Sequence, residues 1–206
     1  MEEVRHEATA KPAVAFGINP RFTGFERLDF EALFGNANRV ALEIGSGKGR
    51  FLMTSAAARP DVNFLGIEKS LHYYRVIEKR LARAALPNTR IINHDALRVL
   101  GAMIPDASLS EVHIYFPDPW PRKREQKRRL VRPEIAELLL RVMRPDASGV
   151  YVSDHQDAFL AGRDVLMTYF ATEDRNALDT PPRTNYEAKY RIEGRPIYEV
   201  RFRVRS

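Results

Sequence analysis

Short apolar runs alternate with amphipathic segments along most of this 206-residue chain. The apolar runs at 39–44, 63–67, 90–94, 111–116 and 149–153 predict strands, and alternating apolar and basic residues at 197–204 predict an edge or antiparallel strand. Helical periodicity predicts helices at 50–58, 71–86, 96–103, 133–143 and 157–170. Strands that are short, apolar on both faces and separated by helices are typical of an α/β fold with a mostly parallel sheet covered by helices.

The chain fits a single domain spanning 1–206, with residues 1–38 as an N-terminal lead-in whose first dozen residues we expect to be flexible. Hydrophobic residues make up 44% of the chain, which is a globular composition. The early acids and the lack of any apolar run near ~18 residues argue against a secretory signal and a membrane span. We therefore expect a soluble, cytoplasmic protein.

Charge and residue usage narrow the possible partners. The net charge is +6 and the pI is about 9.7, which favours a polyanion such as nucleic acid or a membrane surface. The absence of cysteine excludes disulfides and thiol catalysis. The five histidines show no metal-binding spacing, so no metal site is expected.

An acidic residue stands at the end of each of the first five predicted strands. Because ligands of such sheets bind at the carboxyl ends of the strands, we expect these acids to line one site. Asp95 and Asp154, taken alone, are explained equally well as helix N-caps. The five acids are Glu43, Glu68, Asp95, Asp118 and Asp154.

The first acid is followed by a glycine-rich turn, in the stretch EIGSGKG. A phosphate-binding P-loop needs Ser or Thr after its lysine, where Gly49 stands. A dinucleotide fingerprint needs a small third residue where Arg50 stands, and Glu43 would repel a pyrophosphate. Gly45 and Gly47 therefore favour a phosphate-free, cationic ligand, and S-adenosylmethionine fits this description.

The spacing of the next acids supports the same ligand. Glu68 follows Glu43 by 25 residues and ends the next strand, where a carboxylate can accept both hydrogen bonds of a ribose diol. Asp95 would accept from the adenine amine, with Ala96 beside the ring. The glycine turn would hold the methionine part, with Glu43 as an electrostatic anchor.

Several motifs carry a family resemblance over residues 34 to 206. In chain order they are EIGSGKGRFL, FLGIEKS, HDAL, IYFPDPWPRKREQKRRL, SDHQDAF and TNYEAKYRIEGRPIYEVRF. Together they resemble the bacterial tRNA (guanine-N7-)-methyltransferases. The resemblance implies a Rossmann-like class I methyltransferase fold, with a seven-stranded, mostly parallel sheet and an antiparallel C-terminal strand. It also implies methyl transfer from S-adenosylmethionine to N7 of a guanine at position 46 of the tRNA variable loop.

The resemblance also assigns residues to the two halves of the site. Family members usually carry Lys where this chain has Arg122, and often His where it has Glu125. The cofactor positions fall on Glu43, Glu68, Asp95 and Asp118, and the substrate positions fall on Arg122, Asp154, Thr184, Asn185, Tyr186 and Glu187.

Methylation of N7 has simple chemical needs. N7 of guanine carries no proton, so no general base is required. A carboxylate near the developing positive charge on the purine would help, and we assign this catalytic role to Asp118. Trp120 could stack on the base or wall the pocket. We expect phosphate contacts from the basic run Arg122, Lys123, Arg124, Lys127, Arg128, Arg129 and Arg132.

Three other functions stay open on the sequence: a methyltransferase acting on an exocyclic base amine, a non-catalytic RNA-binding protein with the same fold, and an NAD enzyme. Tyr73 and Tyr74 are interpreted as packing residues, and His94 and His113 as strand residues without a role. The sequence does not decide between a monomer and a homodimer.

Overall fold

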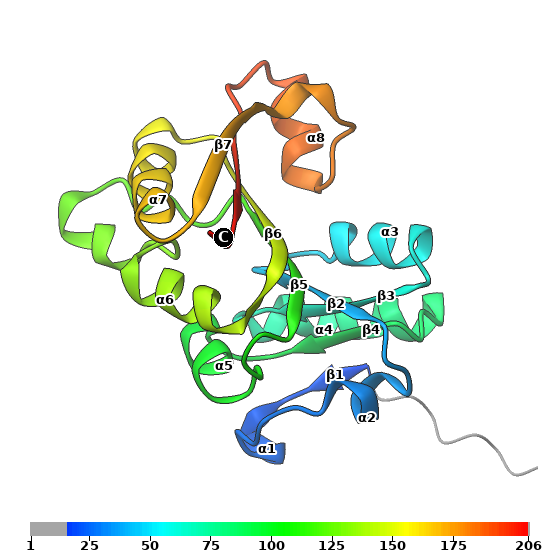
Figure 1. Ribbon diagram of the computed structural model, residues 1–206. Coiled ribbons are helices and arrows are strands. Elements are labelled where there is room, and N and C mark those ends of the chain that lie inside the picture. Colours follow the sequence, from blue (N-terminus) through cyan, green and yellow to red (C-terminus); the bar gives the residue numbers. More distant parts are fainter. Residues whose placement is uncertain (1–15, 206) are drawn as a thin grey trace, which may run out of the picture.

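One eight-stranded sheet forms the centre of the computed structural model, which describes residues 16–205 (Figure 1). The flexibility expected for the first dozen residues concerns a segment outside the described residues. The strand order is β1-β4-β3-β2-β5-β6-β8-β7, and all pairings are parallel except those of β8 with β6 and β7. The strands are β1 (Gly17–Ile18), β2 (Arg39–Ile44), β3 (Val62–Ile67), β4 (Thr89–Ile92), β5 (Leu109–Tyr115), β6 (Met143–Ser153), β7 (Ala171–Asn176) and β8 (Tyr198–Arg203).

Helices cover both faces of this sheet. Figure 1 shows α5, α6 and α7 on the left of the sheet, with α3 to the right and α8 above it. The apolar faces of α3 and α4 bury a second cluster against β2, β3 and β4, separate from the larger cluster under α5, α6 and α7. The helices are α1 (Pro20–Thr23), α2 (Phe30–Phe34), α3 (Arg50–Ala58), α4 (Leu71–Ala84), α5 (Ala96–Ala102), α6 (Pro133–Val142), α7 (Gln156–Tyr169) and α8 (Asn185–Ile192), with 3₁₀ helices η1 (Lys123–Arg128) and η2 (Ala177–Asp179).

The predicted mostly parallel α/β fold with a reversed C-terminal strand is confirmed. The sheet has eight strands rather than seven, because the N-terminal lead-in adds the two-residue strand β1 at the edge beside β4. Its main contacts are backbone ones: the Ile91 amide donates to the Phe16 carbonyl at 2.8 Å, and the Asn93 amide donates to that of Ile18 at 2.9 Å. Such a pairing needs no side-chain pattern, so no periodicity could have predicted it.

The strand register brings the functional segments to one edge. Ile44, the last residue of β2, is level with Ile67 of β3 and Ile114 of β5. Tyr115 of β5 is level with Val152 of β6. The segments that follow these four parallel strands therefore begin side by side, as expected for a ligand site at the carboxyl ends of a parallel sheet.

Candidate active site

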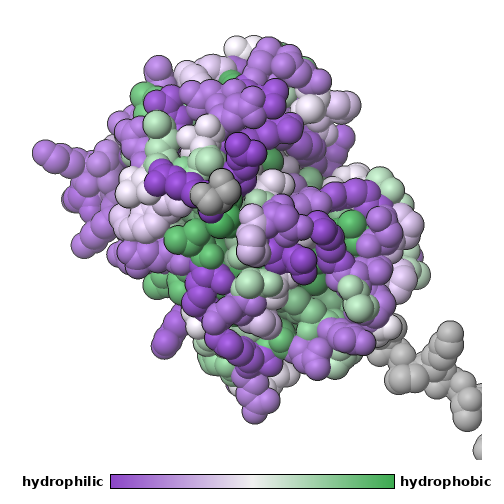
Figure 2. Space-filling model, viewed as in Figure 1, coloured by the Kyte–Doolittle hydropathy of each residue, from purple (hydrophilic) through white to green (hydrophobic). Residues whose placement is uncertain are grey.

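A cavity of about 870 Å³ opens at this edge of the sheet. Its lining comes from the glycine turn, from the residues that follow β3, β4 and β5, and from cations of η1 and its flanks. Most of the face shown in Figure 2 is hydrophilic, with hydrophobic residues visible mainly near its middle. The cavity lining includes Gly45, Gly47, Glu68, Lys69, Ser70, Tyr73, His94, Asp95, Ala96, Tyr115, Phe116, Asp118, Trp120, Lys127, Arg128, Arg132 and Tyr186.

The glycine turn between β2 and α3 depends on left-handed backbone. Gly45 has φ 81° and Gly47 has φ 53°, values that disfavour any residue with a Cβ. A Cβ at either position would meet no atom within 4 Å. The requirement for glycine is therefore conformational, and the absence of side chains leaves this wall of the cavity open to a ligand.

The carboxylate of Glu68 closes the turn from the end of β3. Its Oε2 accepts the Gly47 amide proton at 2.8 Å, and its Oε1 accepts that of Ser70 at 2.8 Å. Burial raises the pKa of Glu68 above its ordinary value, although these backbone donors oppose the shift. Each oxygen keeps a second lone pair, so the predicted bonds to a diol remain possible.

Glu43 lies beneath the turn rather than in the cavity. Its side chain is buried, it is not part of the cavity lining, and its Oε2 has no hydrogen-bond partner among the described residues. Burial raises the pKa of Glu43 to about 8, against the opposing effect of the Ser46 hydroxyl, and the nearby charge of Glu68 raises it further. In the ligand-free protein at neutral pH this carboxyl is therefore mostly protonated.

Asp95 combines the two interpretations that the sequence left open. It is the N-cap of α5, because its Oδ1 accepts the Leu97 amide proton at 3.0 Å, and it also lines the cavity with Ala96. Its Oδ2 contacts Lys69 Nζ at 3.0 Å. Although burial alone would raise it, the hydrogen bond and charge of Lys69 hold the pKa of Asp95 below its ordinary value.

Asp118 stands on an unusual turn after β5. Phe116 and Trp120 have φ values of 50° and 42°, left-handed conformations that are strained for bulky residues. The exposed Asp118 side chain projects into the cavity and has no hydrogen bond or ion pair within residues 16–205. A strained turn thus presents to the cavity a carboxylate that is unpartnered among the described residues.

The basic run after this turn has two kinds of cation. Arg128 lies over the Trp120 ring, with 3.7 Å between its Cζ and the ring centroid. Arg129 is buried, donates from Nε to the Pro119 carbonyl at 2.9 Å, and pairs with Asp157. The expectation that Arg129 contacts phosphate is therefore wrong, because its guanidinium is already used inside the protein. Arg122, Lys123, Arg124 and Lys127 are exposed.

Asp154, at the end of β6, is held by an arginine. Its Oδ2 contacts Arg195 Nη2 at 2.6 Å, and the Arg195 guanidinium lies 4.1 Å from the Tyr190 ring centroid. Tyr190 in turn packs edge-on against Phe116, with 5.4 Å between ring centroids. Asp154 is not part of the cavity lining, but it is linked to the cavity wall through this stack.

The segment Thr184 to Glu187 begins α8. Thr184 is the N-cap, accepting the Glu187 amide proton at 3.0 Å. The side chain of Glu187 is fully buried and accepts from Arg183 and Arg191 at 3.1 and 2.7 Å. Only Tyr186 of this segment lines the cavity, while Asn185 lies 3.5 Å from Arg50 Nη1. The structure brings these residues beside the cavity but gives them different surroundings.

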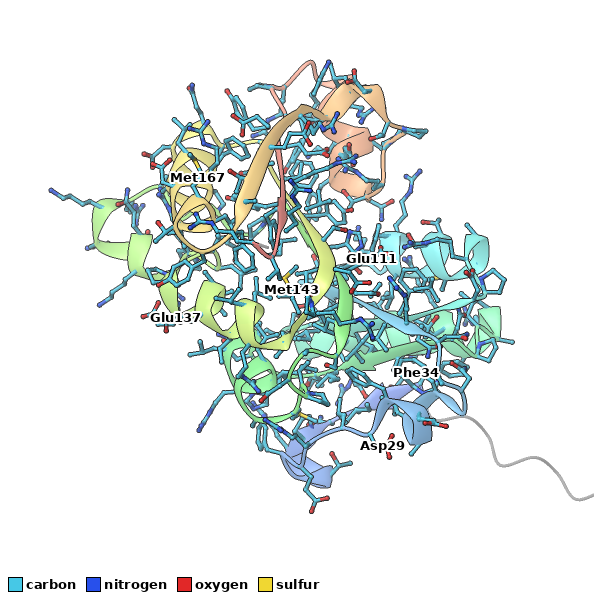
Figure 3. All side chains as sticks on the ribbon, viewed as in Figure 1. Asp29, Phe34, Glu111, Glu137, Met143 and Met167 are labelled. Atoms are coloured by element: carbon cyan, nitrogen blue, oxygen red, sulfur yellow. The ribbon has the colours of Figure 1, made fainter. Side chains whose placement is uncertain are left out.

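A chain of polar contacts along β5, with the buried His113 at its centre, leads to the cavity residue Tyr115. Glu111, on the side of the sheet that faces α3 (Figure 3), accepts from Arg59 at 2.7 Å and from His113 Nε2 at 3.0 Å. The hydrogen bond from His113 lowers the pKa of Glu111 to about 2, and burial lowers that of His113. The neutral His113 then accepts at Nδ1 from the Tyr115 hydroxyl, 3.0 Å away. His113 thus fixes a cavity residue, a role the sequence did not assign.

Two of the cavity residues that the sequence did not predict had been given another interpretation or no role. Tyr73, interpreted as a packing residue, and His94, given no role, both line the cavity. His94 also packs edge-on against Phe25 at 4.7 Å between ring centroids. Each stands within a few residues of a strand-end acid, Glu68 or Asp95. This proximity in the sequence could have indicated that both residues lie at the cavity.

Within residues 16–205, no group of three or more His, Asp or Glu side chains is arranged to hold a metal ion. No helix of the described chain is long and apolar enough to cross a membrane.

The sheet order, the reversed strand β8 and the cavity at the glycine turn define a class I methyltransferase fold. Solved structures agree. The 16S rRNA methyltransferase KamB superposes with a TM-score of 0.66 at 17% identity, covering 88% of this chain and 95% of its own. A 30S ribosomal A1408 methyltransferase from an uncultured bacterium gives a TM-score of 0.60 at 11% identity, with coverages of 87% and 96%.

Sequence comparison gives the family. The family model described as "Putative methyltransferase" matches residues 37–200. The tRNA (guanine-N(7)-)-methyltransferase of Geobacter metallireducens is 36% identical, with 85% of this chain and 86% of the relative covered. That of Nitrosococcus oceani is 35% identical, with coverages of 97% and 89%. The chain belongs to the family of bacterial tRNA (guanine-N(7)-)-methyltransferases, as the sequence motifs predicted.

Proposed function

We propose that this protein transfers a methyl group from S-adenosylmethionine to N7 of a guanine in tRNA, at position 46 of the variable loop. The observation that carries the proposal is the carboxylate of Asp118, unpartnered among the described residues, in a cavity that is also lined by other carboxylates, by a glycine turn and by cations of η1. We expect the reaction to take place in the cytoplasm. Whether one or two copies of the chain act together is left open.

The residues that follow β2, β3 and β4 fit S-adenosylmethionine. They bring the carboxylates of Glu68 and Asp95 and a glycine turn to the cavity, which suit a ligand with a diol, an amine and positive charge. Glu68 would accept from the ribose diol, Asp95 and Ala96 would flank the adenine, and Gly45 and Gly47 would border the methionine part. Glu43 would act from beneath the turn as an electrostatic anchor, and its buried Oε2 has no hydrogen-bond partner among the described residues that would compete for this role. When bound, the cofactor supplies an electrophilic methyl group on a cationic sulfur.

The residues around Asp118 fit a purine acceptor. Because N7 is a bare lone pair, the protein needs only to align it and to stabilise the positive charge that the purine gains. Asp118 would supply the negative charge. Asp154, held by Arg195, would accept from the N1 and amine protons of the guanine edge, and Trp120 would stack on the base.

The cations on and beside η1 would hold the RNA strand that carries the guanine. Arg122, Lys123, Arg124 and Lys127 on or beside η1 are exposed and can reach phosphates. Opposite them, Tyr186 would border the acceptor base, and Asn185 would face the RNA. Thr184 and Glu187 would act by holding the start of α8, since their side chains are buried.

The direct test is incubation of the protein with labelled S-adenosylmethionine and unmodified tRNA, followed by nucleoside analysis. We expect label in 7-methylguanosine only, and loss of that label with Asp118→Ala at unchanged tRNA affinity. Label in a base methylated on an exocyclic amine would overturn the proposal in favour of that reaction. Tight tRNA binding without any transferred label would instead favour a non-catalytic RNA-binding protein, and calorimetric binding of NAD in place of S-adenosylmethionine would favour the dinucleotide enzyme.

A further inference from the structure

Cations without a carboxylate partner are concentrated on two segments that flank the cavity. Elsewhere most exposed cations are paired: Arg39 lies 2.9 Å from Asp146, and Arg175 lies 2.8 Å from Glu173. In the described part of the chain, no carboxylate oxygen lies within 4 Å of the charged groups on η1, on α4 or on the glycine turn. The η1 group is Lys123, Arg124, Lys127 and Arg128; the second group is Lys48, Arg50, Arg75, Lys79, Arg80 and Arg83.

The outer face of α4 carries a regular basic stripe. Arg75, Lys79 and Arg83 are exposed and follow one another at four-residue spacing, so they share one face of the helix over roughly 12 Å. The opposite face, with Ile77 and Leu81, is fully buried. The charge on the stripe is therefore presented outward and is not compensated by the helix itself.

The only acid of α4 does not neutralise the stripe. Glu78 accepts a hydrogen bond from the Tyr74 hydroxyl at 3.0 Å, on the side of the helix that turns toward the protein. Eight of the other residues of this helix are aliphatic residues or tyrosines and cannot offset charge. Three cations thus remain free for an external anion.

The stripe is continuous with the cavity. The N-cap Ser70 and Tyr73 in the first turn of α4 line the cavity, and the helix leads away from it. Arg80 Nη1 donates to the Lys48 carbonyl at 2.7 Å, which attaches the middle of α4 to the glycine turn. Lys48 and Arg50 are exposed on that turn, so positive charge extends from the stripe to the rim of the cavity.

We infer that the outer face of α4 docks a double-helical segment of the same RNA whose guanine enters the cavity, an inference that rests on the proposed function. The η1 cations, two of which line the cavity, would hold the strand beside the target base. A folded RNA also presents paired arms, whose closely spaced phosphates match a straight row of cations better than a single flexible strand does. A membrane surface would call for several large apolar side chains beside the cations, and the same row of α4 carries only one, the exposed Leu71.

The test compares two triple variants with equal loss of charge. Arg75→Gln, Lys79→Gln and Arg83→Gln remove the stripe; Arg21→Gln, Arg144→Gln and Arg203→Gln remove exposed cations elsewhere. The dissociation constant for unmodified tRNA is measured over a range of salt concentrations. We expect the stripe variant to lower the slope of log K against log salt by roughly 2–3 and to weaken tRNA binding roughly tenfold or more at low salt. The control should change the slope much less.

Two further probes decide what docks on α4. Affinity for a short single-stranded RNA containing the target guanine, and for S-adenosylmethionine, should be unchanged in the stripe variant. An unchanged tRNA slope, or an equal loss of affinity for the single strand, would overturn the inference. Formation of 7-methylguanosine by the wild-type protein is scored separately, so a failure of the proposed function leaves the docking measurement readable.

Discussion

The guanidinium of Arg129 is fastened to the carbonyl of Pro119, 2.9 Å from its Nε, directly beneath the turn that presents Asp118. Arg129, a cation within the basic run, thus helps to hold Asp118 in position. We predict that Arg129→Met lowers the turnover number at least about tenfold, because small displacements of a catalytic group cost large factors in rate. Single-turnover kinetics at saturating tRNA would measure this.

The matched control for Arg129 is its exposed neighbour Arg124. Arg124→Met should weaken tRNA binding and reduce the salt dependence by about 1, while the rate at saturation stays near that of the wild type. If Arg129→Met showed the same pattern as Arg124→Met, a phosphate contact by Arg129 would be the better explanation.

Glu43 should give the ligand-free protein a particular dependence on pH. Its pKa is about 8 in the folded protein, against an ordinary value of 4.5. Between these values the folded state keeps a proton that the unfolded chain has lost, so the free energy of unfolding should fall as pH rises. Glu43→Gln should remove this decline, which we expect to be on the order of a few kcal/mol in total. Denaturant titrations from pH 4.5 to 8.5 would measure it.

The exposed acid Glu173 provides the control for that experiment, and Glu173→Gln should keep the wild-type decline. Binding of S-adenosylmethionine should strengthen with pH over the same range and release a proton, because the cation favours the ionised carboxylate. Calorimetry in two buffers of different ionisation enthalpy would detect the proton, and its absence would argue against contact between Glu43 and the cofactor's charge.

Glu187 should matter for stability and Tyr186 for binding. Glu187→Ala would leave Arg183 and Arg191 without their shared, fully buried partner, and such losses typically cost about 3–5 kcal/mol. The paired arginines hold the pKa of Glu187 below its ordinary value, although burial opposes them. Its stabilising contribution should therefore be present above pH 4.5 and be lost as the pH falls further. Thermal unfolding at several pH values is the measurement.

Tyr186→Ala is the companion to that substitution, since it changes the neighbouring side chain at the cavity. It should leave the melting temperature almost unchanged and raise the KM for tRNA. A Tyr186→Ala protein that unfolds as easily as Glu187→Ala would contradict this division of roles.

Gly47→Ala tests the left-handed glycine turn. A Cβ at φ 53° should cost about 1–2 kcal/mol of stability. It would point into open space at the cavity wall, so it should weaken S-adenosylmethionine binding by more than its effect on folding. Gly35→Ala is the control, because Gly35 has φ 73° and open space at the C-cap of α2, outside the cavity lining. Equal effects of both changes on cofactor affinity would argue against the assigned site.

The sequence predicted those parts of the fold that have a periodic signal. The buried faces of β2 and α4 follow the expected apolar spacing, and the strand-end acids Glu68, Asp95 and Asp118 meet in one cavity. The strand β7 is mostly exposed and has no alternation of apolar residues, so the sequence did not predict it.

The sequence also could not predict which side chains pair with residues far away in the chain. Nothing in the local sequence distinguishes Arg129, which pairs with Asp157, from the exposed Arg128 beside it. Likewise the burial of Glu43 under the turn follows from tertiary packing that no motif encodes.

The position of β8 has a consequence for how the chain reaches this structure. β7 precedes β8 in sequence, yet β8 lies between β6 and β7 and is the only strand of the described chain with which β7 pairs. β7 can therefore join the sheet only through β8, once β8 has been made and has paired with it. On a ribosome, the half that contains the glycine turn and Asp118 could form early, whereas α8, which lies between β7 and β8, would settle against it last. The wall bearing Tyr186 should be the final piece of the cavity to become ordered during synthesis.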